Sequence, residues 1–182
     1  KRGFSFQKDE PLDMRYDKNF QTEKADDIIN KWPEAEIERI LREYGEEMFA
    51  WRIAKEIINQ KKKNPIKTTF QLVELIKNAI PRKYQSHRIN PATKTFQALR
   101  IAVNRELENL SRVLPDAVEV LEPGGRIVVI SFHSLEDRLV KNFFKEEQQK
   151  GNLKALTKKP VCASLEEIKQ NPRSRSAKLR AA

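Results

Sequence analysis

The sequence predicts an α/β fold in which an all-helical block precedes a shorter part built from a strand and helices. Residues 22–81 carry apolar side chains at helical spacing. Residues 126–132 form a continuous apolar, β-branched run of strand length directly after a Pro-Gly-Gly turn signal. Such a run is typical of a strand that is buried on both faces of a parallel sheet.

Capping residues and prolines divide the helical block into successive helices. Thr22 is expected to cap the first helix, and Pro33 is expected in the first turn of the second. A third helical stripe ends at the lysine-rich run 61–65. Thr69 is expected to cap the next helix, which Pro81 ends.

The flanking segments are less regular. Residues 1–21 lack a sustained period but hold several large apolar side chains, which predicts a loop packed against the protein. After a basic loop, a strong helix is expected from Phe96 to Leu114, and Pro115 is expected to start a fresh one. Ser134 is expected to cap the helix after the apolar run. The tail predicts a strand within 154–161, a helix at 165–169 and a strand at 176–182.

Positive charge is concentrated in two parts of the chain. The 182 residues carry a formal net charge of +10, and their number fits one domain or one domain with an insertion. Residues 51–100 hold 12 basic and 2 acidic side chains, and residues 150–182 hold 9 and 2. This distribution favours a polyanionic partner, most often nucleic acid, with a solvated lysine-rich surface as the alternative.

Several protein classes are excluded by composition. Cys162 is the only cysteine, which excludes an intramolecular disulfide and a cysteine-cluster zinc site. His87 and His133 are the only histidines, so no metal site is predicted. No apolar run approaches the ~18 residues of a membrane helix. No export signal opens the chain, and we expect a cytoplasmic protein with no membrane partner.

Three polar clusters are candidates for chemistry. Ligands of open α/β sheets bind beyond the carboxyl ends of the strands, where residues 131–138 offer hydroxyls, an imidazole, carboxylates and a guanidinium. Residues 90–100 place basic side chains near a helix N-terminus, which favours phosphate. Residues 171–180 combine spaced arginines with serines, which suits contacts to a nucleic-acid backbone. The alternative for residues 131–138 is helix capping. For residues 90–100 it is a solvated helix face, and for residues 171–180 a flexible basic tail.

Together these stretches resemble the bacterial ribosomal RNA small-subunit methyltransferase H family. The most specific matching runs are Phe96-Gln97-Ala98-Leu99-Arg100 and Ser131-Phe132-His133-Ser134-Leu135-Glu136-Asp137-Arg138. The resemblance covers essentially the whole chain, in the family's order, and its remaining matches lie at 2–6, 11–15, 44–47, 91–95, 101–104, 123–130 and 171–180.

The resemblance implies S-adenosylmethionine-dependent methylation of the exocyclic N4 of a cytidine in small-subunit ribosomal RNA. It implies the C-terminal part of a Rossmann-like class I methyltransferase fold with an all-helical insertion. The corresponding ranges are 1–21 as a loop region of the methyltransferase domain, 22–90 as an RNA-recognising insertion and 91–182 as the remainder of that domain. The partner it implies is small-subunit ribosomal RNA or the ribosomal particle.

Site residues follow from the matching motifs. Ser131, His133 and Asp137 would form the rim of the catalytic pocket, and Phe4, Phe6, Asp13 and Arg15 would line the substrate pocket. Eight residues would bind RNA: Lys94, Gln97, Arg100, Asn104, Arg173, Arg175, Lys178 and Arg180.

This chain departs from the family pattern in several places. The family's glycine-rich cofactor loop and ribose-binding acid precede its Arg-Gly-Phe-Ser-Phe motif, and this chain lacks them. The chain alone is therefore expected to be inactive. Glu10 replaces a usual glycine, and Asn90 and Lys94 stand where the family usually has His and Arg. Lys94 keeps the charge but loses bidentate phosphate geometry.

Two other functions compete with this interpretation. One is a non-catalytic RNA-binding or ribosome-assembly module, which S-adenosylmethionine titration distinguishes from an enzyme. The other is a DNA cytosine-N4 methyltransferase, although the Pro-Pro-aromatic signature common in that class is absent here.

Overall fold

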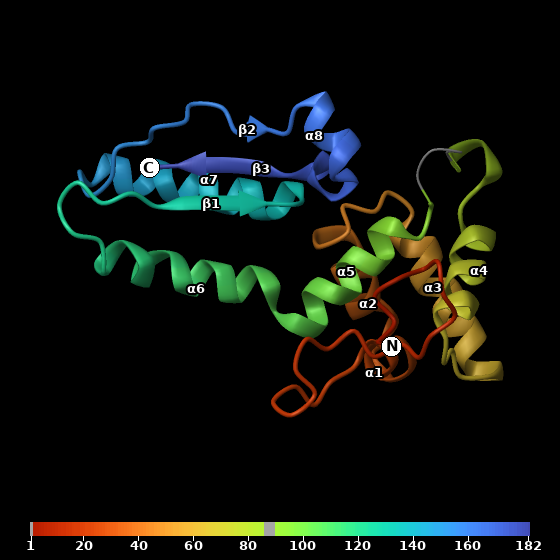
Figure 1. Cartoon of the computed structure of the whole chain (residues 1–182). Helices are drawn as coiled ribbons and strands as arrows, with labels where there is room; N and C mark the ends of the chain where they lie inside the picture. The colour runs from red at the N-terminus through yellow and green to blue at the C-terminus, as the bar shows by residue number, and fades with distance from the viewer. Residues whose placement is uncertain (1, 86–89) are drawn as a thin grey trace. The chain divides into compact units, whose positions relative to one another are not determined.

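The computed structural model describes residues 2–85 and 90–182, and it divides into two compact units, Lys1–Glu106 and Leu107–Ala182. Figure 1 shows the first as a group of helices with a long N-terminal loop and the second as helices with a small sheet. The fold is therefore α/β, as predicted. The predicted ranges 22–90 and 91–182 do not coincide with the units, because residues 91–106 pack with the helical block.

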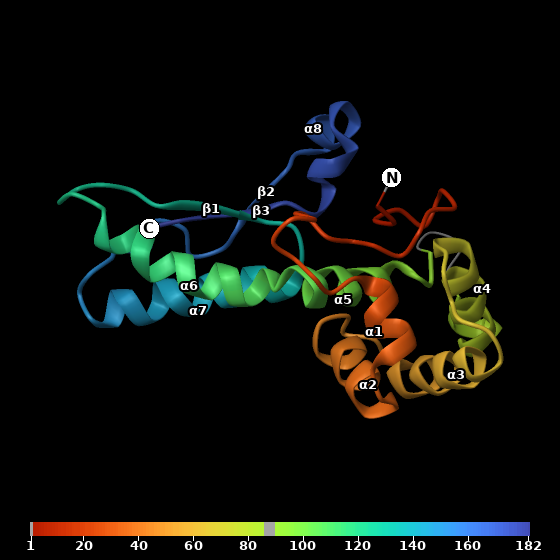
Figure 2. The ribbon, with the colours of Figure 1, turned by 90° about the horizontal axis from the view of Figure 1, so that it is seen from below.

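The first unit is built from short helices around one apolar core. Ile28, Ile40 and Ile53 are fully buried there, as the helical spacing predicts. α2 packs against both α3 and α5 (Figure 2). The helices are α1 (Ala25–Lys31), α2 (Glu34–Glu43), α3 (Ala50–Lys63), α4 (Thr69–Ala79), the 3-10 turn η1 (Arg82–Tyr84) and α5 (Thr93–Asn104).

Two predicted helix caps were wrong by one or two residues. α1 has Lys24, not Thr22, at its N-cap, and the Asp27 carboxylate accepts the Lys24 N–H at 2.9 Å. α4 has Thr68 at its N-cap, with its hydroxyl accepting from the Gln71 N–H. The Thr69 hydroxyl is instead used by the N-terminal loop, because it donates to the Lys8 carbonyl at 2.6 Å.

The N-terminal loop is packed against the first unit, as predicted. Leu12 and Met14 are buried in its core. The Leu12 N–H donates to the Lys67 carbonyl at 3.2 Å, and Pro11 forms an isolated bridge with Thr68. The apolar side chains and these backbone contacts hold the loop in place without regular secondary structure.

The helix predicted from Phe96 to Leu114 is interrupted at Arg105. That residue adopts a left-handed conformation with φ of 50°, and it ends α5. α6 (Glu106–Glu119) begins directly after it and continues through Pro115, so the prediction that Pro115 starts a new helix was wrong. Leu110 and Leu114 pack on the core of the second unit, which stabilises one continuous helix.

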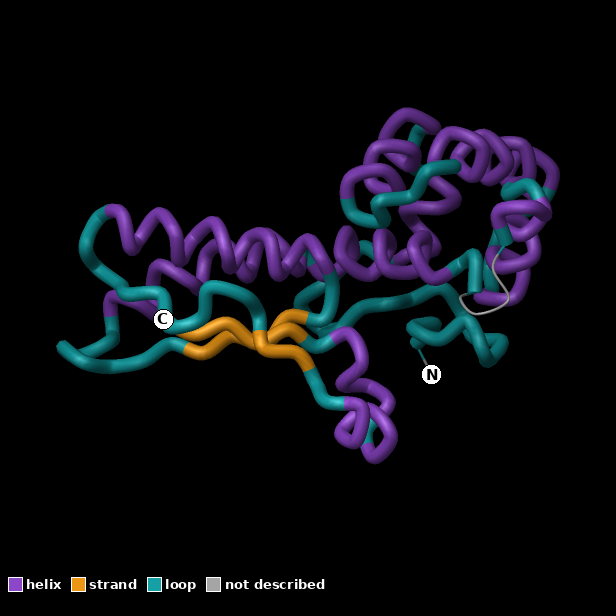
Figure 3. Tube along the Cα trace, turned by 90° about the horizontal axis from the view of Figure 1, so that it is seen from above, coloured by secondary structure: helices purple, strands orange, loops and turns teal. Residues whose placement is uncertain are grey.

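The second unit contains a three-stranded antiparallel sheet in the order β1-β3-β2 (Figure 3). Val129 pairs with Arg180, and Ser131 pairs with Lys178. The tail helix and the final strand are confirmed, whereas only Val161 of the predicted strand at 154–161 is extended. The elements after α6 are β1 (Val128–Ser131), α7 (Ser134–Gln149), β2 (Val161–Cys162), α8 (Leu165–Gln170), η2 (Pro172–Ser176) and β3 (Lys178–Ala181).

The expectation of a parallel strand buried on both faces was wrong for β1. Its hydrogen-bonded neighbour β3 runs antiparallel, and Val128 and Ile130 are 56% and 54% exposed. α6 and α7 lie on the same face of the sheet (Figure 2), where Val129 packs with Val140 and Phe144. The side chains of β1 alternate between faces, so Val128 and Ile130 point away from this core.

No helix in the described part of the chain combines the length and apolar character needed to cross a membrane.

Candidate functional site

The predicted substrate-pocket residues Asp13 and Arg15 form an ion pair in the N-terminal loop. Arg15 Nε and Nη2 donate to the two Asp13 carboxylate oxygens at 2.7 and 3.0 Å. This guanidinium holds the pKa of Asp13 at about 2, below its usual value of 3.8. Arg15 Nη1 also donates to the Gln21 carbonyl at 2.8 Å. The pair thus closes a turn of the loop.

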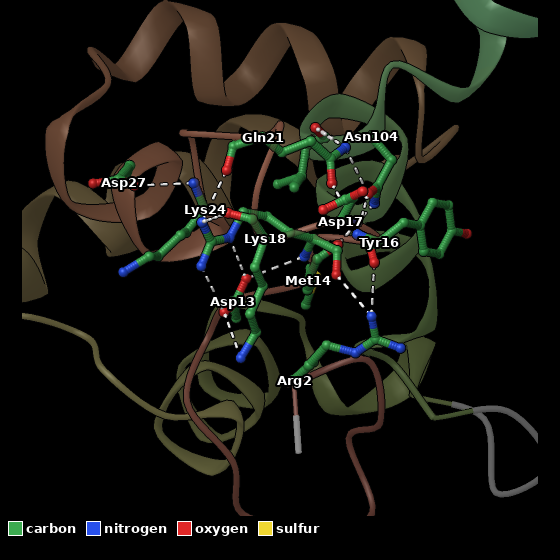
Figure 4. A network of polar contacts seen from close by, with 12 residues as sticks. Arg2, Asp13, Met14, Tyr16, Asp17, Lys18, Gln21, Lys24, Asp27 and Asn104 are labelled. Carbon is green, nitrogen blue, oxygen red and sulfur yellow. Dashed lines mark hydrogen bonds and ion pairs between the residues drawn. The ribbon is translucent and has the colours of Figure 1, made fainter.

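Asn104 joins this loop to the end of α5 (Figure 4). Its amide nitrogen donates to the carbonyls of Met14 and Arg100, both at 2.8 Å. Its amide oxygen accepts from the Tyr16 N–H at 2.8 Å and from Gln21 Nε2 at 3.0 Å. Asn104 is 3% exposed, and these bonds use both donors and both acceptor sites of the amide. Its side chain therefore lies inside the first unit.

Phe4 and Phe6 have different aromatic partners. Phe4 stacks on Tyr16 with 5.5 Å between ring centroids, and the Arg2 guanidinium lies 5.3 Å from the Phe4 ring. Phe6 meets Phe96 edge to face at 5.7 Å. Phe6 also lines a hollow of about 370 Å³ together with Phe70. The loop therefore presents each ring in a separate aromatic cluster.

The start of α5 packs against the turn after α2. Lys94 Nζ donates to the Glu46 carbonyl at 2.8 Å, and Gln97 Nε2 donates to the Tyr44 carbonyl at 2.9 Å. Gly45 fits between these segments because a Cβ atom there would lie 2.8 Å from the Lys94 carbonyl oxygen. The motif 44–47 thus packs against the motif 91–104, although the two lie far apart in the sequence.

Lys94 and Arg100 differ in how much of their charge is already paired. Lys94 is exposed at the start of α5 and bonds only a neutral carbonyl among the described residues. Arg100 Nε lies 2.9 Å from the Glu106 carboxylate. A phosphate contact by Arg100 competes with this carboxylate, whereas Lys94 has no carboxylate partner among the described residues.

The predicted catalytic rim lies in the second unit, around the carboxyl end of β1. Ser131 ends the strand and is buried. His133 is the N-cap of α7, where its Nδ1 accepts from the Glu136 N–H at 3.4 Å. The prediction that Ser134 caps this helix was wrong, because the imidazole fills that position. Glu136 also accepts the Phe132 N–H at 2.8 Å, which completes the turn.

Asp137 is held by two basic side chains of β3. Arg180 Nε and Nη2 donate to its carboxylate at 2.7 and 3.2 Å, and Lys178 Nζ lies at 3.5 Å. The Arg180 hydrogen bonds lower the pKa of Asp137. Arg180 is 6% exposed, so its guanidinium is an internal partner of Asp137. Arg173 and Arg175 of η2, in contrast, are exposed.

Sequence reasoning missed the partners of these residues. Met14, Tyr16 and Gln21 meet Asn104 although more than 80 positions separate them from it. Nothing in the residue types of Met14, Tyr16 and Gln21 predicted this contact. The positive φ of Met14, 59°, is a property of the folded backbone alone.

The chain belongs to the MraW methylase family, whose model matches residues 1–182. It is 51% identical over its whole length to the ribosomal RNA small subunit methyltransferase H of Persephonella marina. The proteins of that name from Pelobacter propionicus and Kosmotoga olearia are 52% and 54% identical, again over the whole chain. The chain spans 61%, 62% and 60% of the lengths of these three relatives.

Proposed function

We propose that this chain is part of an enzyme that transfers a methyl group from S-adenosylmethionine to the N4 of a cytidine in small-subunit ribosomal RNA. The observation that carries the proposal is the family match over the whole chain, together with the names of the relatives. The concentration of positive charge in residues 51–100 and 150–182 supports an RNA substrate.

The chemistry calls mainly for positioning. The N4 lone pair of cytosine is delocalised into the ring, so the amine is a weak nucleophile and must be held in line with the methyl group. The base must also leave its stack to reach the enzyme. Ser131 and His133, at the junction of β1 and α7, are the groups we assign to the pocket rim. Asp137 would act by fixing Arg180 and the start of α7.

The described residues do not form a cradle for S-adenosylmethionine. The space beside Gly3 and Gly45 is filled by backbone oxygens of Pro11, Leu41 and Lys94. Beyond their chain neighbours, nothing lies within 4 Å of where a Cβ atom would stand at Gly124 or Gly151. S-adenosylmethionine would supply the methyl group, and we derive no step through it from this chain. The exposed apolar side chains Val128 and Ile130 of β1 support a Rossmann-like domain, because in such domains helices cover both faces of the sheet.

RNA contacts would come from the exposed basic side chains. Lys94, Arg173 and Arg175 are exposed, and Lys178 is partly exposed. Lysine and arginine side chains that neutralise phosphates release counterions, which makes the affinity fall with salt. Gln97 and Arg100 lie beside Lys94 on α5 and could contact RNA after rearranging their present bonds.

Methyl transfer from tritiated S-adenosylmethionine to unmethylated small ribosomal subunits tests the proposal, using the protein at the length of its relatives. We expect N4-methylcytidine in the digested RNA. His133→Asn keeps an N-cap acceptor but removes the imidazole, and we expect it to slow transfer by about 10- to 100-fold. Methylation at another atom would overturn the cytidine assignment, and a wild-type rate in His133→Asn would remove His133 from the site. RNA binding without any transfer would favour the non-catalytic module.

A further inference from the structure

A small hollow opens in the first unit where the starts of α3 and α5 meet the end of α4. Its volume is about 210 Å³. This is smaller than the sites that hold drug-sized ligands, and it suits a single ring system. The lining includes Glu47, Phe49, Ile80, Tyr84, Pro91 and Lys94.

One wall of this hollow is aromatic and reaches the surface. Phe49 and Tyr84 lie with ring centroids 5.1 Å apart and planes tilted by 54°. Tyr84 is 52% exposed, and Lys83 Nζ lies 5.0 Å from its ring centroid. An exposed ring beside a cation is the arrangement with which proteins stack unpaired nucleobases.

The polar groups of the hollow differ between its interior and its rim. Glu47 is 6% exposed and lines the hollow. One of its carboxylate oxygens accepts the Phe49 N–H at 2.9 Å, and no hydrogen bond from the described residues reaches the other. At the rim, Lys94 Nζ is held by the Glu46 carbonyl at 2.8 Å. An interior acceptor matches the N–H groups of a base, and cations at the rim match its phosphate.

The surrounding charge favours RNA over an apolar peptide. Ile80, Tyr84 and Lys94 of its lining belong to the stretch 51–100, which holds 12 basic and 2 acidic side chains. An apolar side chain would cover the second carboxylate oxygen of Glu47 without donating a hydrogen bond to it, which is unfavourable. A nucleotide satisfies both the acceptor and the cations.

We propose that this hollow holds the base of one unpaired nucleotide of the RNA substrate, stacked on Tyr84 with its phosphate at Lys83 and Lys94. The inference rests on the proposed function for the identity of the ligand. It adds a nucleobase-binding site in the helical unit, made by residues outside the methyltransferase motifs except for Glu47, Pro91 and Lys94.

The test compares single-stranded and duplex RNA of the same sequence, about 12 nucleotides long, with a fluorescent label. Affinities of the whole chain are measured by fluorescence anisotropy at constant salt. We expect Tyr84→Leu to weaken single-stranded binding about 10-fold and Tyr84→Phe to leave it unchanged, because stacking needs the ring and not the hydroxyl. Duplex binding should be unaffected, since its bases are not available for stacking.

Trp51→Leu is the matched control. Trp51 is 47% exposed and has the Arg52 guanidinium 5.1 Å from its ring, but it does not line the hollow. We expect both of its RNA affinities to equal those of the wild type. Thermal melting by circular dichroism checks that each variant is folded, and a variant with a wild-type melting temperature gives an interpretable affinity.

Equal single-stranded affinities for wild type and folded Tyr84→Leu would overturn the inference, as would an equal loss in Tyr84→Phe. If the wild type binds neither RNA, the inference and the RNA substrate of the proposed function fail together. If Tyr84-dependent binding is found but methyl transfer is not, the nucleobase site stands and the proposed catalytic function fails.

Discussion

The side-chain amide of Asn104 donates a hydrogen bond of 2.8 Å to the backbone oxygen of Met14, 90 positions earlier in the chain. Met14 is buried and has a φ of 59°, a left-handed conformation that costs about 1–2 kcal/mol for a residue with a side chain. The same amide accepts from the Tyr16 N–H. The end of α5 therefore stabilises a strained turn of the N-terminal loop.

Replacing Asn104 should destabilise the first unit. Asn104→Ala removes the partners of the Met14 carbonyl and the Tyr16 N–H, and we expect the free energy of unfolding to fall by about 2–3 kcal/mol. Urea unfolding followed by circular dichroism measures this. Asn19→Ala is the control, because Asn19 is exposed in the same loop, and it should change stability little. A wild-type midpoint for Asn104→Ala would show that the amide does not hold the loop.

The Asp13–Arg15 pair should make stability depend on pH in the acid range. The folded pKa of Asp13, about 2, is below its ordinary value of 3.8. The ionised carboxylate therefore stabilises the folded state above pH ~4, and this contribution is lost as pH falls through ~2. This difference between the two pKa values corresponds to about 2 kcal/mol in the free energy of unfolding at neutral pH.

Asp13→Asn tests this pH dependence. Its free energy of unfolding should be about 2 kcal/mol below that of the wild type at pH 7, and the two curves should converge between pH ~4 and ~2. Exposed Asp116→Asn serves as the control and should parallel the wild type throughout. A pH-independent difference between Asp13→Asn and the wild type would mean that the variant acts through packing and not through charge.

Gly45 should tolerate no side chain. A Cβ atom there would lie 2.6 Å from the Leu41 carbonyl oxygen and 2.8 Å from that of Lys94. We expect Gly45→Ala to separate the end of α2 from the start of α5 and to cost about 1–3 kcal/mol. Gly124→Asn is the control, because nothing lies within 4 Å and asparagine tolerates a positive φ. Thermal melting compares the two, and equal melting temperatures would contradict the close approach.

The arginines of the C-terminal tail should separate into a structural residue and RNA-binding residues. Arg180 is buried on Asp137, so Arg180→Gln should lower the free energy of unfolding by about 3 kcal/mol. Arg173 and Arg175 are exposed, so the double variant Arg173→Gln/Arg175→Gln should melt like the wild type. If both arginines neutralise phosphates, the double variant should release about two fewer counterions when it binds RNA. Its RNA affinity should then fall less steeply with salt.

Binding titrations at several salt concentrations, together with melting curves, distinguish these roles. If Arg180→Gln is folded and its RNA affinity depends less steeply on salt than that of the wild type, Arg180 binds RNA. An unchanged salt slope in the Arg173/Arg175 variant would remove both arginines from the RNA contact. Arg39→Gln is a suitable control, because Arg39 lies outside both basic stretches and its guanidinium pairs with Glu36 and Glu43, each at 2.9 Å.

The sequence predicted which residues of the helical block are buried, but it misplaced helix caps. Periodic apolar residues such as Ile40 and Ile53 are buried, because a helix must turn its apolar face to the core. The cap at Thr69 was misplaced because its hydroxyl bonds Lys8, 61 positions away. Local propensity could not distinguish Thr68 from Thr69, since both are good capping residues.

The candidate site was predicted as a set of residue types, not as contacts. The sequence selected Asp13, Arg15, Asp137 and Arg180 one by one from the matching motifs, whereas the structure pairs Asp13 with Arg15 and Asp137 with Arg180. It grouped Arg180 with Arg173 and Arg175, although Arg180 is buried and the other two are exposed. The difference depends on the β1–β3 pairing, which brings Arg180 beside the start of α7.

The sequence by itself determined the family, the helical periodicity and the two basic stretches, because motif order, spacing and charge are properties of the chain. Only the tertiary structure decided which basic side chains remain available to a phosphate. It also decided that β1 pairs antiparallel with β3, because an apolar run predicts burial but does not specify the direction of its hydrogen-bonded neighbour. Contacts such as Asn104–Met14 and Asp137–Arg180 join residues 90 and 43 positions apart, and no local pattern specifies them.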